Sequence, residues 1–185
     1  MNKSSRTRLR CLSECAVFVA LALVLSYLKI PLGFTFGGFG GSIDLVMIPL
    51  IIVAFRWGLG AGLVFGTLKF FFAGGSAINW ESMLLDYSVA YMFVGFAGLL
   101  CRKKGLLWLA ALIGCLCRFA VHFLSGITIY AEYMYDIFGL PMSNVWIYSA
   151  LYNASYMLPN TVLAVLVCLL LQKPLKKYLL GEDLR

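Results

Sequence analysis

The sequence predicts an all-α membrane protein with six transmembrane helices in a single domain. Of its 185 residues, 62% are hydrophobic and only 12% are charged, against about 25% charged in a typical soluble domain. The apolar residues form long continuous runs, unlike the alternating pattern of barrel strands. Because a membrane-spanning helix needs about 20 residues, one domain over residues 1–185 has room for six spans joined by short loops.

The first predicted span covers residues 9–28 and follows a basic N-terminal tail. No convincing small-residue cleavage site follows a short apolar core, so we expect a retained helix rather than a signal peptide. Glu14 is expected to pair with Arg10 or another nearby cation. Ala16 and Ala20 put small side chains on one face of this helix, which permits close approach of another helix.

The second predicted span covers residues 44–56, after a glycine-rich stretch at residues 31–41 that is unsuited to a stable helix. We expect this stretch to form an outer loop within residues 31–43. A plain linker and a lid over a site both remain open interpretations of it. Ser42 or Asp44 is expected to cap the second helix, because short polar side chains accept hydrogen bonds at that position.

The third predicted span, residues 58–73, contains Gly58, Gly62 and Gly66 at intervals of four residues. Glycines at that spacing lie on one face of a helix and let a neighbouring helix approach closely, so we predict a packing seam. Lys69 lies near the outer end of this span and is expected to extend to the membrane surface.

The last three predicted spans are residues 81–101, 106–129 and 144–171, and each places polar side chains in an apolar run. Charge inside a membrane is costly, so such residues mark functional sites or internal polar networks. Four residues of the fifth span are spaced by four and form one stripe along the helix: Arg118, His122, Gly126 and Tyr130. At about 1.5 Å per residue, Asp86, His122 and Asn153 reach a similar depth in the outer half of the membrane.

A carboxylate, an imidazole, an amide and several aromatic rings at one depth suit a cationic heteroaromatic ligand. Aromatic rings attract a desolvated cation by about 2 kcal/mol or more, and Asp86 would supply the counter-charge. The rings at this level belong to Tyr87, Tyr130, Tyr148 and Tyr152. The alternative is an internal polar network in which Asp86 pairs with Arg118 and His122 bonds to a carbonyl.

Lysines and arginines are unequally divided between the two predicted sides of the membrane. Four lie in residues 3–10, one is Arg56, three lie in residues 102–104 and four in residues 173–185, all flanking the spans on one side. Lys29 lies in a predicted outer loop. Because loops rich in Lys and Arg remain in the cytoplasm, we predict that both termini are cytoplasmic.

Several function classes find little support in the sequence. The basic clusters flank apolar runs, which indicates membrane orientation rather than nucleic-acid binding. Neither Cys11 with Cys15 nor Cys115 with Cys117 has the CxxC spacing of a zinc site, so we expect no metal and no cofactor. The chain has no GxxxxGK[ST] phosphate loop, no HExxH and no nucleophile elbow, so an intramembrane enzyme is a disfavoured alternative.

Four stretches of the chain carry a resemblance to a known family: GGSIDLVMIPLIIVAFRWGLGAGL, LLDYSVAY, RFAVHFLSG and VWIYSALYNASYMLP. Over most of its length the chain resembles the thiamine-specific S components of energy-coupling factor (ECF) transporters, the ThiT (YuaJ) family. The resemblance implies a six-helix S-component fold in the cell membrane that captures thiamine outside the cell with high affinity. It also implies docking on a transmembrane T protein and two ATPase subunits, which supply the energy for uptake.

The resemblance also assigns roles by position. The family's binding acid, usually glutamate, is Asp86 here, and Tyr130 stands where some members have a stacking tryptophan. The implied ligand-binding residues are Asp86, Tyr87, Arg118, His122, Gly126, Tyr130, Tyr148 and Asn153, and the family's AxxxA docking motif matches Ala16 and Ala20. An S component for another vitamin or a thiamine precursor, and a structural membrane subunit, remain alternatives.

Overall fold

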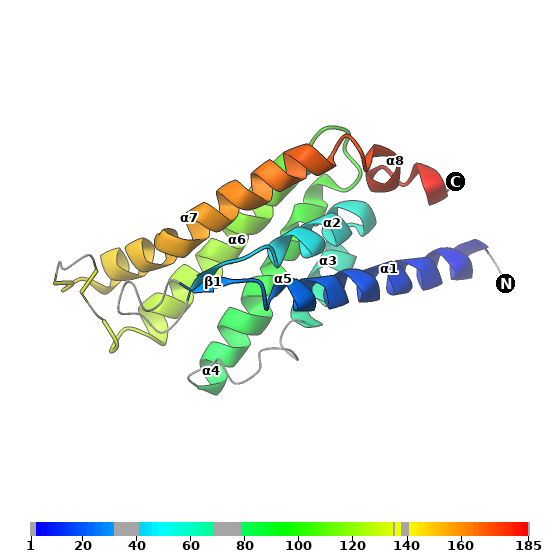
Figure 1. Cartoon of the computed structure of the whole chain (residues 1–185). Helices are drawn as coiled ribbons and strands as arrows, with labels where there is room; N and C mark the ends of the chain where they lie inside the picture. Colours follow the sequence, from blue (N-terminus) through cyan, green and yellow to red (C-terminus); the bar gives the residue numbers. More distant parts are fainter. Residues whose placement is uncertain (1–2, 32–40, 69–78, 135, 138–140, 185) are drawn as a thin grey trace.

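A computed structural model describes residues 3–31, 41–68, 79–134, 136–137 and 141–184 of the chain. Most of these residues are helical and pack into one elongated bundle (Figure 1). The helices α6 (Leu107–Thr128) and α7 (Val145–Leu171) lie side by side and form the most extensive contact between any two described elements. This pair provides one wall of the bundle.

Described helices overlap all six predicted spans. The first three are α1 (Lys3–Leu25), α2 (Met47–Trp57) and α3 (Leu59–Thr67), and the last two are α6 and α7. Among the residues that the structure describes, three helical stretches are long and apolar enough to cross a membrane, namely Trp80–Leu100, Leu107–Thr128 and Val145–Leu171. The count of six crossings stays a prediction, as does the part of the third span beyond residue 68, including Lys69, which lies outside the described residues.

The fourth predicted span changes its helix type along its length. It is α-helical in α4 (Trp80–Ser82), π-helical in η2 (Met83–Val89), α-helical again in α5 (Ala90–Val94) and 3₁₀-helical in η3 (Gly95–Leu100). A π-helical turn takes in one more residue than an α-helical turn, and such turns are rare and frequently lie at functional sites. The sequence predicted the extent of this span but not its wide turn.

Helix α2 is short and enclosed by the rest of the bundle. Its eleven residues extend about 16 Å, roughly half of a membrane's hydrocarbon thickness of about 30 Å, and all residues from Met47 to Arg56 are buried. Pro49 lies in the first turn, where its missing N–H removes no helical hydrogen bond. A helix with no lipid-facing side needs no amphipathic pattern, which agrees with its nearly continuous apolar sequence.

A two-stranded antiparallel ladder precedes α2 and departs from the all-α prediction. Strand β1 (Ile30–Pro31) pairs with β2 (Ser42–Ile43). The side chain of Asn160 on α7 accepts from the backbone N–H of Asp44 at 2.8 Å and donates to the carbonyl oxygen of Ser42 at 2.6 Å. Non-helical backbone within a membrane protein needs such internal partners.

The predicted cap of the second helix is wrong. Helix α2 begins at Met47, and the residue before it, Val46, makes no side-chain cap. Instead Oδ1 of Asp44 accepts from the N–H of Val46 at 3.0 Å, and Ser42 donates to Asp44. These bonds form a turn ahead of the helix, because an aspartate readily accepts from the residue two positions on. The loop residues 32–40 lie outside the described residues, so the lid interpretation stays a prediction.

The predicted glycine seam is confirmed at two of its three positions. A Cβ atom on Gly62 would lie 2.8 Å from Cα of Gly95, and one on Gly66 would lie 2.3 Å from the carbonyl oxygen of Tyr91. Gly58 instead makes the turn between α2 and α3, with φ of 91°. The seam fixes the fourth predicted span against α3 and so positions η2.

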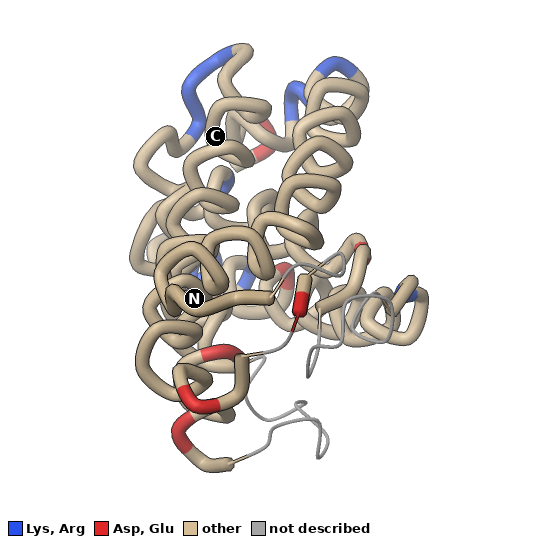
Figure 2. The backbone as a smooth tube through the Cα atoms, turned by 90° about the vertical axis from the view of Figure 1, so that its left-hand side faces the viewer, with Lys and Arg blue, Asp and Glu red and all other residues tan. Residues whose placement is uncertain are grey.

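Basic residues gather at one end of the bundle. In Figure 2 the turns at the top of the view carry Lys and Arg. Lys104 and Lys176 line one pocket, and Arg10 donates to the carbonyl oxygen of Asp183 at 2.9 Å. The start of α1 and the last helices, α8 (Lys176–Leu179) and η4 (Glu182–Leu184), therefore lie at the same end (Figure 1).

Candidate functional site

Asp86 lies in the π-helical turn of η2 and accepts hydrogen bonds from three side chains. Its Oδ1 is 2.9 Å from Nδ1 of His122. Its Oδ2 accepts from the hydroxyl of Ser82 at 3.1 Å and from that of Tyr130 at 3.3 Å. The carboxylate, whose side chain is 13% exposed, thus joins the fourth predicted span to α6 and to Tyr130, two residues beyond the end of α6.

His122 connects this carboxylate to a buried arginine. Nε of Arg118 donates to Nε2 of His122 at 3.2 Å, one helical turn away on α6. Nη2 of Arg118 donates to the hydroxyl of Tyr91 at 3.0 Å, and the guanidinium also lies 4.1 Å from the centre of the Tyr91 ring. Four charged or polar groups therefore follow one another from α5 across α6 to η2.

Helix α7 closes the other side of the site through Asn153. The Nδ2 group of Asn153 donates to the carbonyl oxygen of His122 at 3.2 Å, and its Oδ1 accepts from the hydroxyl of Tyr156 at 2.6 Å. Close contact between α6 and α7 depends on Gly126, because an added Cβ would lie 2.2 Å from Oγ of Ser149. The lack of a side chain at position 126 brings Asn153 within reach of α6.

Aromatic rings line α7 beside these polar groups. The rings of Tyr148 and Tyr152 are stacked at 5.8 Å between centres, and Tyr152 meets Tyr156 edge to face at 5.9 Å. The ring of His122 approaches Tyr156 at 6.0 Å, also edge to face. Tyr87 follows Asp86 in η2 and is half-buried.

The structure brings together most of the residues that the sequence singled out. Asp86, His122 and Asn153 meet, as their predicted depths indicated. The alternative prediction, in which Asp86 pairs with Arg118 and His122 bonds to a carbonyl, is wrong. Asp86 pairs with His122, and Arg118 donates to that histidine and to Tyr91.

Three participants were missed from the sequence. Ser82 precedes Asp86 by four residues, Tyr91 follows it by five, and Tyr156 follows Asn153 by three. The four- and three-residue spacings are those of an α-helix and could have been noticed. The five-residue spacing puts Tyr91 on the side of Asp86 only if a π-helical turn lies between them, which the sequence did not predict.

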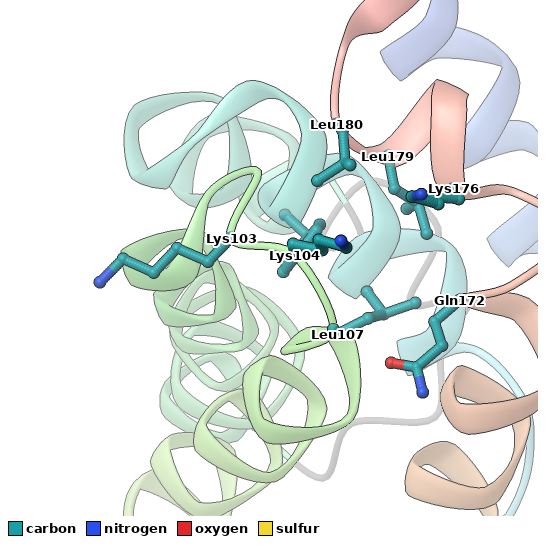
Figure 3. A pocket seen from close by; sticks show the side chains of 9 residues that line it. Lys103, Lys104, Leu107, Gln172, Lys176, Leu179 and Leu180 are labelled. Atoms are coloured by element: carbon teal, nitrogen blue, oxygen red, sulfur yellow. The ribbon is translucent and has the colours of Figure 1, made fainter.

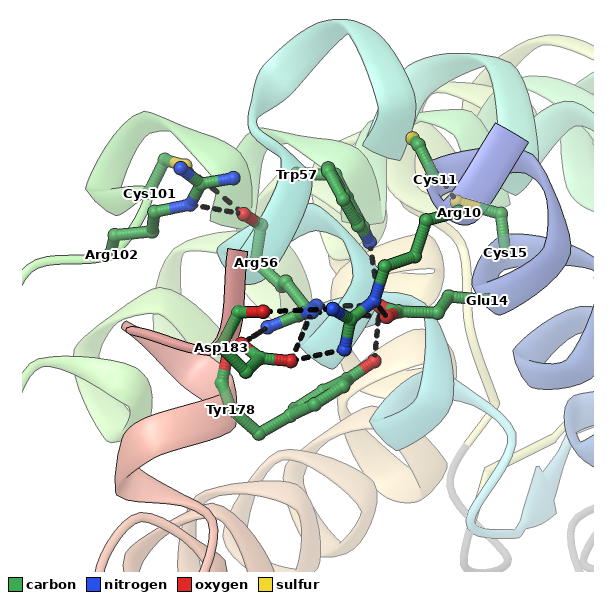
Figure 4. A network of polar contacts seen from close by, with 10 residues as sticks. All are labelled: Arg10, Cys11, Glu14, Cys15, Arg56, Trp57, Cys101, Arg102, Tyr178 and Asp183. Carbon is green, nitrogen blue, oxygen red and sulfur yellow. Dashed lines mark hydrogen bonds and ion pairs between the residues drawn. The ribbon is translucent and has the colours of Figure 1, made fainter. Parts of the chain in front are cut away.

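A second charged cluster lies at the end of the bundle where the chain termini meet (Figure 4). Arg56, at the end of α2, is 0% exposed. Its Nε donates to Oε2 of Glu14 at 2.5 Å, and its Nη2 donates to Asp183 at 2.9 Å. The predicted pairing of Glu14 with Arg10 is confirmed at 2.8 Å, and Arg56 is its second partner.

Two aromatic residues complete this second cluster. Nε1 of Trp57 and the hydroxyl of Tyr178 both donate to Oε2 of Glu14, at 3.0 and 2.8 Å. The guanidinium of Arg56 also lies 3.7 Å from the centre of the Tyr178 ring. Burial is the main cause that raises the pKa of Tyr178, and its bond to the Glu14 carboxylate adds to the effect. The cluster ties α1, α2 and the last helices together.

Ala16 and Ala20 lie on the exposed side of α1. Large apolar side chains of the same helix are exposed beside them, with Val17 at 66% and Val24 at 59%. Because the alanine side chains are small, another helix could approach the backbone of α1 closely there, while Cys15 and Val19 face the bundle. The two alanines are therefore open to contact by another protein or by lipid.

A small pocket lies at the basic end, lined by Phe55, Leu107 and Leu179 with Lys104 and Gln172 at its edge (Figure 3). Lys103 points away from it. Its lining is mainly apolar and contains no carboxylate, so it does not suit a cationic ligand.

Comparison with known proteins agrees with this arrangement. The family model described as "Thiamine transporter protein (Thia_YuaJ)" matches residues 12–180. The chain is 34% identical to thiamine transporter ThiT of Bacillus subtilis, covering 92% of this chain and 93% of that protein. It is 28% identical to thiamine transporter ThiT of Lacticaseibacillus paracasei, covering 83% and 82% of the two chains.

A solved structure of ThiT from Listeria monocytogenes has the same fold. It aligns with a TM-score of 0.79 at 25% identity and covers 94% of this chain and 98% of that one. The match agrees with the S-component fold expected from the sequence. With a family model over nearly its whole length and a relative above 30% identity, this chain belongs to the YuaJ family of thiamine transporters, which are transport proteins and not enzymes.

Proposed function

We propose that this chain is the high-affinity thiamine-binding S component of an ECF-type vitamin transporter. The observation that carries the proposal is the position of Asp86, a largely buried carboxylate at the junction of η2, α6 and α7, with tyrosines around it. A buried negative charge is retained where it binds something or pairs with a cation. Thiamine carries a permanent positive charge on one of two heteroaromatic rings, which matches this chemistry.

Asp86 retains capacity for a ligand. A carboxylate offers about four lone-pair positions, and three hydrogen bonds to Asp86 come from Ser82, His122 and Tyr130. The tyrosine rings would stack on the ligand, while the amide and imidazole would orient it. The proposed ligand-binding residues are Asp86, Tyr87, Arg118, His122, Gly126, Tyr130, Tyr148 and Asn153, with Gly126 acting through the close contact of α6 and α7.

The proposed partners are an ECF transmembrane T protein and two ECF ATPase subunits. The exposed Ala16 and Ala20 on α1 support a docking face, because small residues let a partner helix approach closely. Both ends of the chain lie at the basic end of the bundle, which supports a multi-pass protein in the plasma membrane with cytoplasmic termini.

Calorimetry with detergent-purified protein tests the binding proposal. Thiamine should bind, while riboflavin should not, and thiamine phosphates and the aminopyrimidine precursor should compete more weakly. Asp86→Asn should lose about 2 kcal/mol or more of binding free energy, about thirty-fold in Kd, because the ligand's charge loses its counter-charge. Preference for another vitamin, or wild-type affinity in Asp86→Asn, would contradict the proposal.

Uptake in cells that carry the transporter tests the docking proposal. Ala16→Trp should abolish coupled uptake without changing thiamine binding by the purified subunit, because the indole would hold a partner helix away. Leu116→Trp is the matched control, since Leu116 is exposed on α6, away from α1. Normal uptake by Ala16→Trp would exclude this face as the docking surface.

A further inference from the structure

We infer that Arg118 is a positioning residue that fixes the tautomer of His122 and keeps that histidine uncharged. The proton then lies on Nδ1, facing Asp86, and the carboxylate keeps its full negative charge. That this charge serves a cationic ligand rests on the proposed function, whereas the tautomer does not.

The direction of the hydrogen bonds follows from the chemistry of the guanidinium. Arginine carries only N–H donors and stays protonated in proteins. Its Nε–H group lies 3.2 Å from Nε2 of His122, so that ring nitrogen must present a lone pair. A histidine with an unprotonated Nε2 is neutral and carries its proton on Nδ1. Nδ1 lies 2.9 Å from Oδ1 of Asp86, which accepts that proton's hydrogen bond.

Tyr91 holds the guanidinium in this orientation. Its hydroxyl accepts from Nη2 of Arg118 at 3.0 Å, and its ring lies under the guanidinium at 4.1 Å. Arg118 is only 6% exposed, so water does not offer a competing acceptor on most sides. Nη1 has no hydrogen-bond partner among the described residues. Two donor groups of Arg118 are thus bound by acceptors on different helices, His122 on α6 and Tyr91 on α5. These two bonds fix the direction of the Nε–H group.

Protonation of Nε2 would place two donors and two positive charges face to face. A carboxylate beside a histidine ordinarily favours the charged ring. Here Arg118 removes the only free ring position, since Nδ1 is already protonated toward Asp86. Asp86 is left with hydrogen bonds from a neutral imidazole and two hydroxyls, and no cationic side chain bonds to it in the described part of the chain.

Other titratable groups around His122 do not offer an alternative proton acceptor. Tyr156 of α7 approaches the ring with its edge at 6.0 Å and donates its hydroxyl proton to Asn153. Tyr130 bonds to the other oxygen of Asp86. The carboxylate of Asp44, ahead of α2, accepts instead from the hydroxyl of Ser42 and the N–H of Val46. Among the described residues, Asp86 and Arg118 are therefore the charges that decide the state of the ring.

Nuclear magnetic resonance of the ring nitrogens tests the inference directly. His122 is the only histidine of the chain, so ¹⁵N-histidine labelling reports one site without assignment. In thiamine-free protein we expect a protonated Nδ1 and an unprotonated Nε2 across about pH 5 to pH 8, the range in which an ordinary histidine titrates. A proton on Nε2 at neutral pH, as the other tautomer or as imidazolium, would overturn the inference.

Three variants separate the effect of Arg118 from a general loss of structure. Arg118→Met should let His122 gain a second proton within that pH range, because Nε2 is released. Arg118→Lys should retain the neutral Nδ1–H form, since an ammonium group is also a pure donor. Tyr91→Phe keeps the Nε–H donor and should also retain it. Retention of the neutral form in Arg118→Met would refute the role of Arg118 even if the other variants behave as expected.

Thiamine affinity then links the tautomer to binding. Wild-type Kd should change by less than about twofold between pH 8 and pH 5, whereas Kd of Arg118→Met should rise by about tenfold as its imidazolium competes for Asp86. If wild-type protein fails to bind thiamine, the proposed function fails while the resonance result still decides the tautomer. If it binds and Arg118→Met shows a flat pH profile, the link to Asp86 is refuted.

Discussion

Arg56 and Arg118 are both buried in the bundle, and their partners differ. Arg56 donates to two carboxylates, those of Glu14 and Asp183, and to the carbonyl oxygen of Tyr178. Arg118 donates to a neutral ring and a phenol, and one of its amino groups has no partner among the described residues. The first cluster balances its charges internally, whereas the second leaves the charge of Asp86 without a bonded cation.

This difference separates a structural role from a binding role. A charge cluster with every donor paired has nothing to gain from a ligand, and it fastens α1 to α2 and the last helices. A cluster whose carboxylate has no bonded cation is stabilised when a cationic ligand binds. Burial of charge alone therefore does not distinguish the proposed ligand site from the Arg56 cluster, whereas the sign and number of the bonded partners do.

Removal of Arg56 should cause the largest loss of stability. In Arg56→Met the carboxylate of Glu14 loses its main buried partner, which should cost about 3 kcal/mol or more in the free energy of unfolding. Thermal unfolding of purified protein measures this, with Lys103→Met as an exposed control expected within about 0.5 kcal/mol of wild type. An equal effect of both variants would remove the contrast between the two clusters.

A side chain at position 126 should disturb the cluster around Asp86 and His122. In Gly126→Ala the new Cβ would overlap Ser149, so we expect a loss of about 1–3 kcal/mol of stability together with weaker thiamine binding. Gly60→Ala is the matched control, because nothing lies within 4 Å of its Cβ position on α3 and a helix favours alanine. Unfolding and calorimetry of both variants would show whether the contact between α6 and α7 positions Asn153.

Acidification should give the smallest effect on stability, and the effect should arise in the cluster of Arg56, Glu14 and Asp183. Hydrogen bonds from Arg56 lower the pKa of Asp183. Its contribution to stability is present above its unfolded pKa of about 3.9 and is lost as pH falls through the lower folded value. The difference in unfolding temperature between wild type and Asp183→Asn should therefore shrink below about pH 4. A difference that grows on acidification would contradict this assignment.

The sequence predicted the long apolar elements well. The fifth span was expected at residues 106–129 and is α6 at Leu107–Thr128, and the sixth at 144–171 is α7 at Val145–Leu171. A long apolar run in a membrane has one helical solution, so its extent follows from composition. The ladder of β1 and β2 was missed because its stability depends on Asn160, 118 positions after Ser42.

The site was predictable in its members but not in its connections. Helical rise alone placed Asp86, His122 and Asn153 at one depth. Which of them bond together depends on rotation about each helix axis, and the π-helical turn in η2 changes that rotation. The cluster around Arg56 was only partly predicted, since Arg10 and Glu14 are neighbours on one helix while Arg56 and Asp183 are 127 positions apart.

Because of the π-helical turn of η2, the direction of the Asp86 carboxylate depends on the number of residues in this segment. Deleting a single residue between Met83 and Val89 would let the segment close into ordinary α-helical winding, because a π-helical turn holds one residue more than an α-helical turn. The helix on either side would keep nearly the same rotation, but Asp86 would lose the wide turn that presents it to His122. A one-residue deletion in this segment should therefore disturb the surroundings of Asp86 more than it disturbs the packing of the helix on either side.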